Sequence, residues 1–268
     1  MQLSLLLAAL ALTAALSAPV PVQPEDTAPG ASAEQTETQT RFVLHAGGTT
    51  PSGIAGTNSV EALDHSYALG YRCMEIDFCW TSDGQLACVH DWESWYPIGH
   101  VPTAAEFDAL RADRGFTSLT VADLADWLRS HSDAAVVTDV KERNVEAARL
   151  LADACPDLLD RFIVQIYAPE QYAAVRACGF SHVWLTLYQL PWEVKTDTAL
   201  LGQYVRACGL EALVFSVELV PRAGYVDELL ALGVPLYAHT ANTAEEQDAL
   251  RAAGIFGIYT DCGDAYAP

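Results

Sequence analysis

Residues 42–91 read FVLHAGGTTPSGIAGTNSVEALDHSYALGYRCMEIDFCWTSDGQLACVHD. The stretch begins with the apolar run 42–44, which predicts a buried strand. After a loop rich in Gly and Thr, Asn58 or Ser59 is placed to cap a helix, because their side-chain oxygens accept from the free amides of a first helical turn. Residues 73–78 predict a second strand. The order strand, helix, strand is typical of a parallel β/α unit.

Two carboxylates lie within the second predicted strand. Glu75 and Asp77 are two residues apart, so their side chains lie on the same face of the strand. On a parallel strand that helices cover, both faces are buried. Buried carboxylates are costly without a cation or a basic partner, so this pair indicates a site rather than a solvated surface.

Two histidines follow apolar runs in the same stretch. His45 comes directly after the first predicted strand, and the pair His90 and Asp91 follows the run 85–89. A single histidine at a strand end is more often structural than catalytic. Two histidines that accompany two buried carboxylates favour a functional site.

Short apolar runs continue to alternate with helical segments beyond residue 91. The strands that we expect are residues 42–44, 73–78, 134–140, 162–166, 182–187, 212–216, 235–239 and 256–260. Eight such units predict an α/β fold, a (β/α)8 TIM barrel that occupies residues 41–268.

The active sites of these barrels lie at the carboxyl ends of the strands. The polar residues at or just past the predicted strand ends are His45, Glu75, Asp77, Asp139, Lys141, Gln165, Tyr188, Glu218, His239 and Asp261. Their convergence on one end of the barrel predicts an enzyme.

The predicted strand ends also suggest a chemistry. Glu75, Asp77 and Asp139 form an all-oxygen donor set, which suits Mg²⁺ or Ca²⁺ better than zinc. Lys141 adds a positive charge two residues after Asp139. A cation together with a lysine can clamp a phosphate, and nearby histidines can transfer protons to and from it.

At these residues the sequence resembles the glycerophosphodiester phosphodiesterase family. That family has a histidine after the first strand, an asparagine at a helix start, a Glu-x-Asp strand, an acidic-Gly turn and a His-Asp pair. Here these elements are His45, Asn58-Ser59, Glu75-Ile76-Asp77, Asp83-Gly84 and His90-Asp91. Matches at residues 138–141 and 259–261 extend the resemblance over most of residues 42–261.

The resemblance implies a metal-dependent hydrolase of glycerophosphodiesters or related lipid-head-group phosphodiesters. It implies that His45 and His90 are the general acid and base, and that Glu75, Asp77 and Asp139 hold the metal. We assign substrate or phosphate contacts to Lys141, Gln165, Tyr188 and His239. The expected partner is a small phosphodiester.

Three positions depart from the family pattern. Ala46 stands where the family usually has an arginine that helps to hold the phosphate, and Gly56-Thr57 replaces a Pro-Glu pair. Asp139 replaces a glutamate, as in the spider-venom-type phospholipases D of the same superfamily. We therefore expect Lys141 to carry more of the phosphate binding, with Arg41 or an arginine from the loops as a candidate to assist.

Other interpretations fit the same residues. A phospholipase-D-like lyase would form a cyclic phosphate by intramolecular attack. A non-catalytic barrel that binds metal or phosphate is favoured by the missing arginine. A Schiff-base aldolase would need Lys141 as its nucleophile, but the neighbouring Asp139 would keep that amine protonated.

The amino-terminal sequence differs from the rest of the chain. Residues 3–16 are apolar but too few for a comfortable membrane span, and small residues follow. We expect residues 1–17 to be a secretory signal peptide, or alternatively an uncleaved anchor, and residues 18–40 to be a disordered linker. This predicts a secreted or extracytoplasmic protein.

Composition narrows the choice of partners. The net charge of −21, with 14 basic residues, argues against binding to nucleic acid and against stable binding to an anionic membrane. The seven cysteines show no metal-binding spacing, and a pair among Cys73, Cys79 and Cys88 is as acceptable as buried free thiols.

Overall fold

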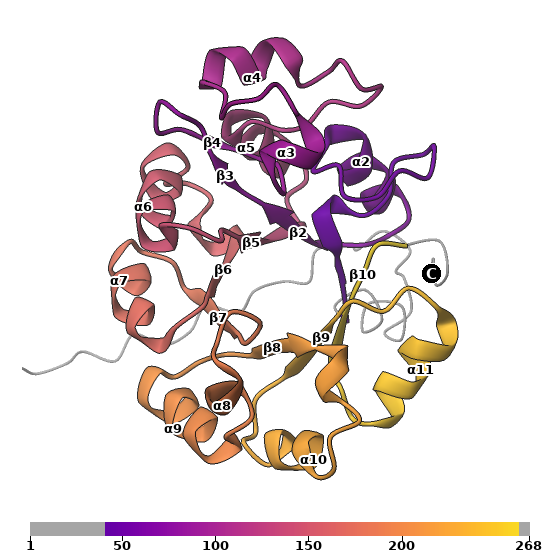
Figure 1. Cartoon of the computed structure of the whole chain (residues 1–268), viewed down its shortest axis with the longest axis vertical. Helices are drawn as coiled ribbons and strands as arrows, with labels where there is room; N and C mark the ends of the chain where they lie inside the picture. The colour runs from indigo at the N-terminus through magenta and orange to yellow at the C-terminus, as the bar shows by residue number, and fades with distance from the viewer. Residues whose placement is uncertain (1–40, 263–268) are drawn as a thin grey trace, which may run out of the picture.

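The computed structural model describes residues 41–262 and shows a closed barrel of parallel strands (Figure 1). The barrel strands are β1 (Phe42–Leu44), β2 (Cys73–Asp77), β5 (Ala135–Asp139), β6 (Phe162–Ile166), β7 (His182–Thr186), β8 (Leu213–Ser216), β9 (Leu236–His239) and β10 (Gly257–Thr260). They are neighbours in that order, and β10 closes onto β1. The predicted TIM barrel is confirmed.

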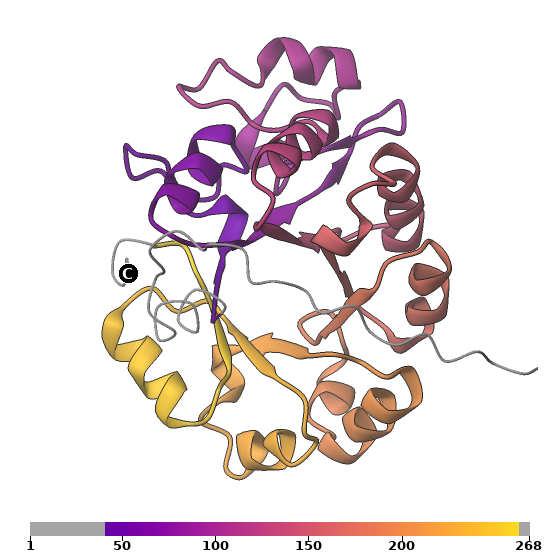
Figure 2. The same cartoon turned by 180° about the vertical axis from the view of Figure 1, so that it is seen from behind.

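Helices surround the barrel, as both views show (Figures 1 and 2). They are α2 (Val60–Ala68), α5 (Val121–Ser130), α6 (Asn144–Ala154), α7 (Tyr172–Ala177), α9 (Thr198–Cys208), α10 (Tyr225–Leu230) and α11 (Ala244–Ala252). Shorter turns complete the connections: η1 (His45–Gly47), η2 (Leu159–Arg161), η3 (Pro169–Gln171), α8 (Trp192–Lys195) and η4 (Val217–Leu219).

Local capping sets where several helices begin. The Ser59 hydroxyl accepts a hydrogen bond from the backbone N–H of Ala62 at the start of α2, so Ser59 rather than Asn58 is the cap. Thr120 and Asp123 form a reciprocal capping box at the start of α5. Buried apolar residues on the inner face of α5 then hold it against the barrel.

A side extension interrupts the barrel between β2 and α5. It contains β3 (Cys79–Trp80), β4 (Leu86–Ala87), α3 (Trp92–Trp95) and α4 (Ala104–Leu110). The two strands pair antiparallel in a separate small sheet, and Ala87, Val89, Tyr96 and Phe107 form a core of their own. Only Leu86 and Ala87 of the apolar run 85–89 form a strand, and α3 is a single turn held by the Asp91 cap.

The barrel interior is filled with apolar side chains along much of its length. Val43, Val137, Trp184, Val214 and Tyr237 pack together there with neighbouring residues. The rings of Trp184 and Tyr237 stack with centroids 4.2 Å apart. A larger apolar core lies between the strands and the surrounding helices. The interior is therefore packed rather than open through its length.

The described residues bear on two further expectations, a membrane span and a disulfide. Within residues 41–262, no helix is long and apolar enough to cross a membrane. The expected signal peptide and linker, residues 1–40, lie outside the described residues. Cys73, Cys79 and Cys88 form no disulfide.

Candidate active site

Polar side chains line the inside of the barrel at the carboxyl ends of its strands. Every second residue of a barrel strand faces the interior. His45 comes two positions after the interior residue Val43, and His239 comes two positions after Tyr237, so both histidines face inward. The residues that share the central cavity include His45, Glu75, Asp139, Gln165, Thr186, Tyr188 and His239. Most of the predicted strand-end residues therefore meet at this end of the barrel, whereas Glu218 is exposed and lines a neighbouring cavity.

Glu75 and Asp77 are the most deeply buried acidic groups of this region, each 2% exposed. The backbone N–H of Ala46 donates to Oε2 of Glu75 at 2.8 Å, and Nδ2 of Asn58 donates to Oδ2 of Asp77 at 3.0 Å. The other carboxylate oxygens, Oε1 of Glu75 and Oδ1 of Asp77, accept no hydrogen bond from residues 41–262. Burial, and then the charge of Asp77, raises the pKa of Glu75 well above its ordinary value. Two buried carboxylate oxygens that accept no hydrogen bond suit a cation site.

His45 is held by a carboxylate from the last strand. Its Nδ1 lies 2.7 Å from Oδ1 of Asp261, and Nδ2 of Asn242 donates to the other oxygen of Asp261 at 2.6 Å. Burial of the ring opposes protonation, but the hydrogen bond to Asp261 and the charges of Glu75 and Asp77 outweigh it and raise the pKa of His45 to about 9. In the metal-free protein His45 is therefore positively charged at neutral pH.

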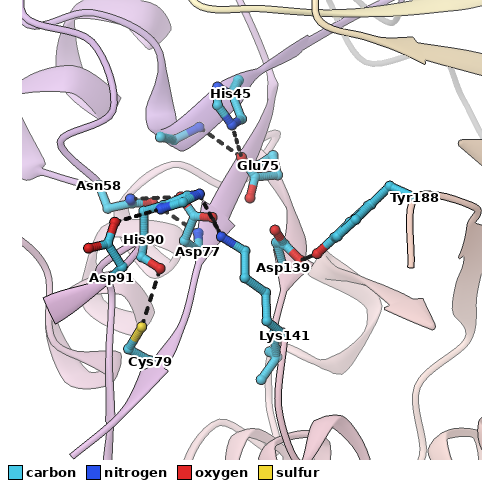
Figure 3. Close-up of polar contacts among 12 residues, drawn as sticks. His45, Asn58, Glu75, Asp77, Cys79, His90, Asp91, Asp139, Lys141 and Tyr188 are labelled. Carbon is cyan, nitrogen blue, oxygen red and sulfur yellow. Dashed lines mark hydrogen bonds and ion pairs between the residues drawn. The ribbon is translucent and has the colours of Figure 1, made fainter. Parts of the chain in front are cut away.

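His90 reaches the site from the side extension rather than from a barrel strand. Its Nε2 lies 2.5 Å from Nζ of Lys141, and its Nδ1 lies 3.0 Å from Oδ2 of Asp91 (Figure 3). Nζ of Lys141 is also 3.8 Å from Oδ1 of Asp77. A protonated Lys141 donates to Nε2, so the ring proton of His90 is on Nδ1 and is donated to Asp91. Nε2 of His90 is thus a proton acceptor beside the carboxylates.

A cavity of about 330 Å³ lies next to this arrangement. Asp77, His90 and Lys141 line one part of it, and Trp80 and Trp92 of the side extension line another. The volume is within the range of small-molecule sites. The extension therefore supplies both a histidine and an aromatic wall.

Asp139 faces the same centre from β5, where it is the ladder partner of Asp77. Its Oδ1 accepts a hydrogen bond from the hydroxyl of Tyr188 at 2.9 Å (Figure 3) and another from the hydroxyl of Tyr167. The two phenols orient the Asp139 carboxylate. Burial raises the pKa of Tyr167 and of Tyr188, and the negative charge of Asp139 raises them further.

A possible metal-binding triad is present. One donor atom from each of His45, Glu75 and Asp77 lies within 4.8 Å of the other two. Asp139 is outside this tight group, although its charge contributes to the raised pKa of Asp77 after burial. The assignment of Asp139 as a metal ligand stays a prediction.

Gln165 is tied into the barrel wall. Its Nε2 donates to the carbonyl of Thr138 at 3.2 Å, and its Oε1 accepts from the Tyr259 hydroxyl at 3.4 Å. It is 3% exposed. These bonds give Gln165 a structural task, and its predicted contact with substrate stays a prediction.

His239 lies between two tyrosine rings. The centroids of Tyr188 and Tyr259 are 6.0 and 6.3 Å from that of its imidazole. Its Nε2 is buried and has no hydrogen-bond partner within residues 41–262. Burial, and then the nearby charge of His45, lowers the pKa of His239 to about 4, so the ring is neutral at pH 7.

Arg41 does not take the place of the arginine that Ala46 replaces. It precedes β1 and therefore lies at the amino end of the barrel, where its guanidinium sits 5.8 Å from the centroid of the Phe256 ring. The proposed assistance from Arg41 is wrong, because the site lies at the opposite ends of the strands. Lys141 is the basic residue that contacts His90 and Asp77.

Sequence reasoning did not assign roles to Asp261, Asn242 and Tyr167. Asp261 was recognised as a polar residue at a strand end. Tyr167 directly follows β6, so the same search for polar residues at strand ends would have found Tyr167. Asn242 lies three residues after β9 and carries no pattern of its own. The partners of these residues depend on barrel closure, which sequence spacing does not reveal.

The contact with Asp261 gives a direct prediction for His45. Asp261→Asn is expected to lower the pKa of His45 by roughly one to two units, because a neutral amide removes the adjacent negative charge. An NMR titration of the histidine ring protons measures this. Glu211→Gln, which neutralises the partner of the surface residue His182, is the matched control and should leave His45 unchanged. A His45 pKa that stays near 9 in Asp261→Asn would contradict the assigned contact.

The open end of the (β/α)8 barrel gathers two histidines, a lysine and buried carboxylates, a set of residues suited to metal-assisted chemistry on a phosphate. The sequence profile of the glycerophosphoryl diester phosphodiesterase family matches residues 45–265. The chain belongs to this family, and the resemblance seen in the sequence is confirmed.

Several solved structures share the fold. A glycerophosphodiester phosphodiesterase from Parabacteroides distasonis is 19% identical, with a TM-score of 0.64 over 82% of this chain and 92% of that one. The enzyme from Thermotoga maritima is 16% identical, with a TM-score of 0.61 over 83% and 95%. A phosphodiesterase from Oleispira antarctica, solved with the product sn-glycerol-3-phosphate, is 15% identical, with a TM-score of 0.63 over 85% and 95%. No curated protein matches the sequence.

Proposed function

We propose that the protein is a divalent-metal-dependent hydrolase of glycerophosphodiesters or related lipid-head-group phosphodiesters, and that His45 and His90 transfer the protons. The observation that carries this proposal is the meeting of His45, His90 and Lys141 around the buried pair Glu75 and Asp77 (Figure 3). The net charge of −21 disfavours docking on anionic lipid, which makes a soluble diester the preferred substrate.

The residues fit a hard cation. Glu75 and Asp77 each present a buried oxygen without a donor, and Asp139 is the predicted third ligand. Oxygen donors of this kind suit Mg²⁺ or Ca²⁺. When bound there, the cation would polarise the phosphoryl oxygens and offset their negative charge.

Lys141 is the proposed phosphate contact. In the described structure its ammonium group lies between His90 and Asp77. A phosphate at this place would draw the ammonium toward its oxygens, which releases Nε2 of His90. The backbone N–H of Ala46 is engaged by Glu75, so this position orients a carboxylate rather than the phosphate.

The two histidines are prepared for opposite proton transfers. His45 is protonated and held by Asp261, which suits it to protonate the leaving alcohol. Nε2 of His90 is an acceptor, which suits it to take a proton from the attacking water. A cation on Glu75 and Asp77 would reduce their effect on His45, and Asp261 would then be the main group that keeps its proton.

Hydrolysis of glycerophosphocholine and of bis(4-nitrophenyl) phosphate tests the proposal, with Mg²⁺, with Ca²⁺ and with EDTA. We expect turnover that requires a cation, with glycerol 3-phosphate as the product in ³¹P NMR. A cyclic phosphate would instead assign the protein as a lyase. A protein that binds the cation but turns over neither diester would overturn the proposal in favour of a binding barrel.

We further propose that residues 1–17 act as a secretory signal peptide and that the protein works outside the cytoplasm. The apolar run of residues 3–16, followed by small residues, supports this. Amino-terminal sequencing of the protein recovered from the periplasm or medium of a bacterial host would locate the signal-peptide cleavage site. A protein that retains Met1 and stays with the membranes would favour the uncleaved anchor.

A further inference from the structure

Another cavity adjoins the central site beside α8, in the connection that follows β7 (Figure 1). Its volume is about 230 Å³, and its lining includes Tyr188, Trp192, Lys195, Glu218 and His239. Tyr188 and His239 also line the central cavity, so the two spaces are neighbours. Pockets for whole ligands are usually larger than this. The cavity therefore suits one substituent of a diester rather than the entire molecule.

Lys195 brings a positive charge to this cavity. It is half-buried, its Nζ donates to the carbonyl of Tyr188 at 3.4 Å, and it forms no ion pair within residues 41–262. The chain has 35 acidic residues against 14 basic ones, and its other lysine, Lys141, lies 3.8 Å from Oδ1 of Asp77. An ammonium group without a carboxylate partner in so acidic a chain is available to an anionic group of a ligand.

His239 adds a second donor to the same cavity. Its Nε2 is buried and has no hydrogen-bond partner in the described part of the chain. Burial and then the charge of His45 lower the pKa of His239, and the charge of Lys195 lowers it further. The ring is therefore neutral and can carry its proton on Nε2. A carboxylate, which only accepts hydrogen bonds, can accept from both Lys195 and His239.

Glu218 gives the cavity a charge of the opposite sign. It is exposed, and its carboxylate pairs neither with Lys195 nor with any other basic residue among residues 41–262. Its backbone N–H donates to the hydroxyl of Ser216 at 3.3 Å. A phosphate monoester with two negative charges would be repelled by Glu218. A group that carries one carboxylate and one ammonium, as an α-amino acid does, would satisfy both Lys195 and Glu218.

The cavity lies on the side of the proposed proton donor. His45 lines the central cavity together with Tyr188 and His239. The hydroxyl of Tyr188 donates to Asp139, while its carbonyl accepts from Lys195, so this one residue links the carboxylates of the reacting centre to the cavity. The alcohol that His45 would protonate as it leaves is therefore the substituent placed to enter the cavity.

We propose that this cavity binds the leaving alcohol of the diester when that alcohol carries an α-amino acid group, with its carboxylate on Lys195 and His239 and its ammonium on Glu218. Lys195 and Glu218 are then specificity-determining residues. The inference rests on the proposed function for its reaction, and it narrows the preferred substrates to diesters of a hydroxylated amino acid such as serine.

The test crosses two substitutions with three substrates. Glycerophosphoserine has the carboxylate and the ammonium, glycerophosphoethanolamine has only the ammonium, and glycerophosphoglycerol has neither. Lys195→Gln and Glu218→Gln each remove one charge from the cavity. Arg149→Gln is the matched control, because it removes a positive charge from an exposed position on α6 that does not line the cavity.

We expect the parent protein to have its highest kcat/KM with glycerophosphoserine. Lys195→Gln should lower that value on the order of 10-fold and change the values for the other two substrates little. Glu218→Gln should cause a smaller loss, shared by glycerophosphoserine and glycerophosphoethanolamine, because Glu218 is exposed. Arg149→Gln should behave as the parent protein with all three substrates.

Rescue by a conservative variant separates charge from packing. Lys195→Arg keeps the positive charge and should keep most of the preference for glycerophosphoserine. Losses of equal size on all three substrates in Lys195→Gln would show a merely structural role and overturn the inference. A parent protein without any preference for glycerophosphoserine over glycerophosphoethanolamine would overturn it as well.

A binding measurement separates this inference from the proposed reaction. Calorimetry with Mg²⁺ compares glycerophosphoserine with glycerophosphoethanolamine in His90→Ala, since His90 does not line the cavity. Tighter binding of glycerophosphoserine, lost when Lys195→Gln is added, supports the inference even if the parent protein hydrolyses no diester. Equal binding of the two diesters, with turnover by the parent protein intact, leaves the reaction standing and refutes the amino acid site.

Discussion

Glu75→Gln is expected to abolish stabilisation of the protein by Mg²⁺ or Ca²⁺ and to lower kcat/KM on the order of 100- to 10,000-fold. The substitution keeps the size of the side chain but removes the charge of the buried Glu75 carboxylate, whose Oε1 has no hydrogen-bond partner in the described residues. A cation at a phosphoryl group contributes several kcal/mol to transition-state stabilisation, and each ~1.4 kcal/mol is a factor of ten in rate. Asp77→Asn should have the same effect for the same reason.

Thermal melting gives a readout that needs no activity. Burial, and then a neighbouring carboxylate, raises the pKa of both Glu75 and Asp77. The folded chain therefore binds the carboxyl protons of Glu75 and Asp77 more tightly than the unfolded chain does. Without metal, the stability that these protons contribute is lost as the pH rises from about 4.5 through the pKa values of the folded protein. A bound cation removes the penalty, so the gain in Tm from Mg²⁺ should be larger at pH 8 than at pH 5.

Controls make the metal prediction specific. Glu75→Gln should melt at a higher temperature than the parent protein in EDTA at pH 8, because it no longer buries an ionised carboxylate. It should show no gain with Mg²⁺. Glu211→Gln, a change at an exposed acidic residue paired with His182, should keep the full gain. Undiminished stabilisation by Mg²⁺ in both Glu75→Gln and Asp77→Asn would rule out this metal site.

The second large effect is expected at the histidines. His45→Ala and His90→Ala should each lower kcat/KM for glycerophosphocholine on the order of 100- to 10,000-fold, which is the usual range for loss of a general acid or base. His182→Ala is the matched control, because His182 begins β7 at the amino end of the barrel and is partly exposed. Its activity should equal that of the parent protein.

The leaving group distinguishes the two roles. A 4-nitrophenolate leaves without needing a proton, whereas choline, the alcohol released from glycerophosphocholine, needs one. If His45 is the proton donor, His45→Ala should lose much less activity on bis(4-nitrophenyl) phosphate than on glycerophosphocholine, while His90→Ala should lose as much on both. The reverse pattern would exchange the roles. Full activity in both variants would refute histidine catalysis.

The resemblance to a known family made the site residues easier to predict than the contacts between them. Glu75 and Asp77 were found because two carboxylates alternate inside an apolar run, and His45 because it directly follows one. The structure places all three within one group of donor atoms. His90 was found by its order in the family pattern, and the fold shows that it belongs to a side extension and not to a barrel strand.

The sequence by itself determined the barrel, because the alternation of apolar runs and helical segments is a local property that each unit carries. It also determined which side chains stand at the strand ends, since side-chain direction follows the period of two. A capping residue at position 58 or 59 also predicted the start of α2, which Ser59 caps.

Only the tertiary structure decided which of those side chains meet. Asp261 holds His45 from 216 positions away because β10 closes against β1. Lys141 meets His90 because the side extension contacts the segment after β5, where Trp80 donates to the carbonyl of Glu142. The central cavity that His239 lines likewise exists only once inward-facing side chains from several strands share one interior. Such contacts depend on strand register and rotamers across the closed barrel, and no local pattern in the sequence encodes them.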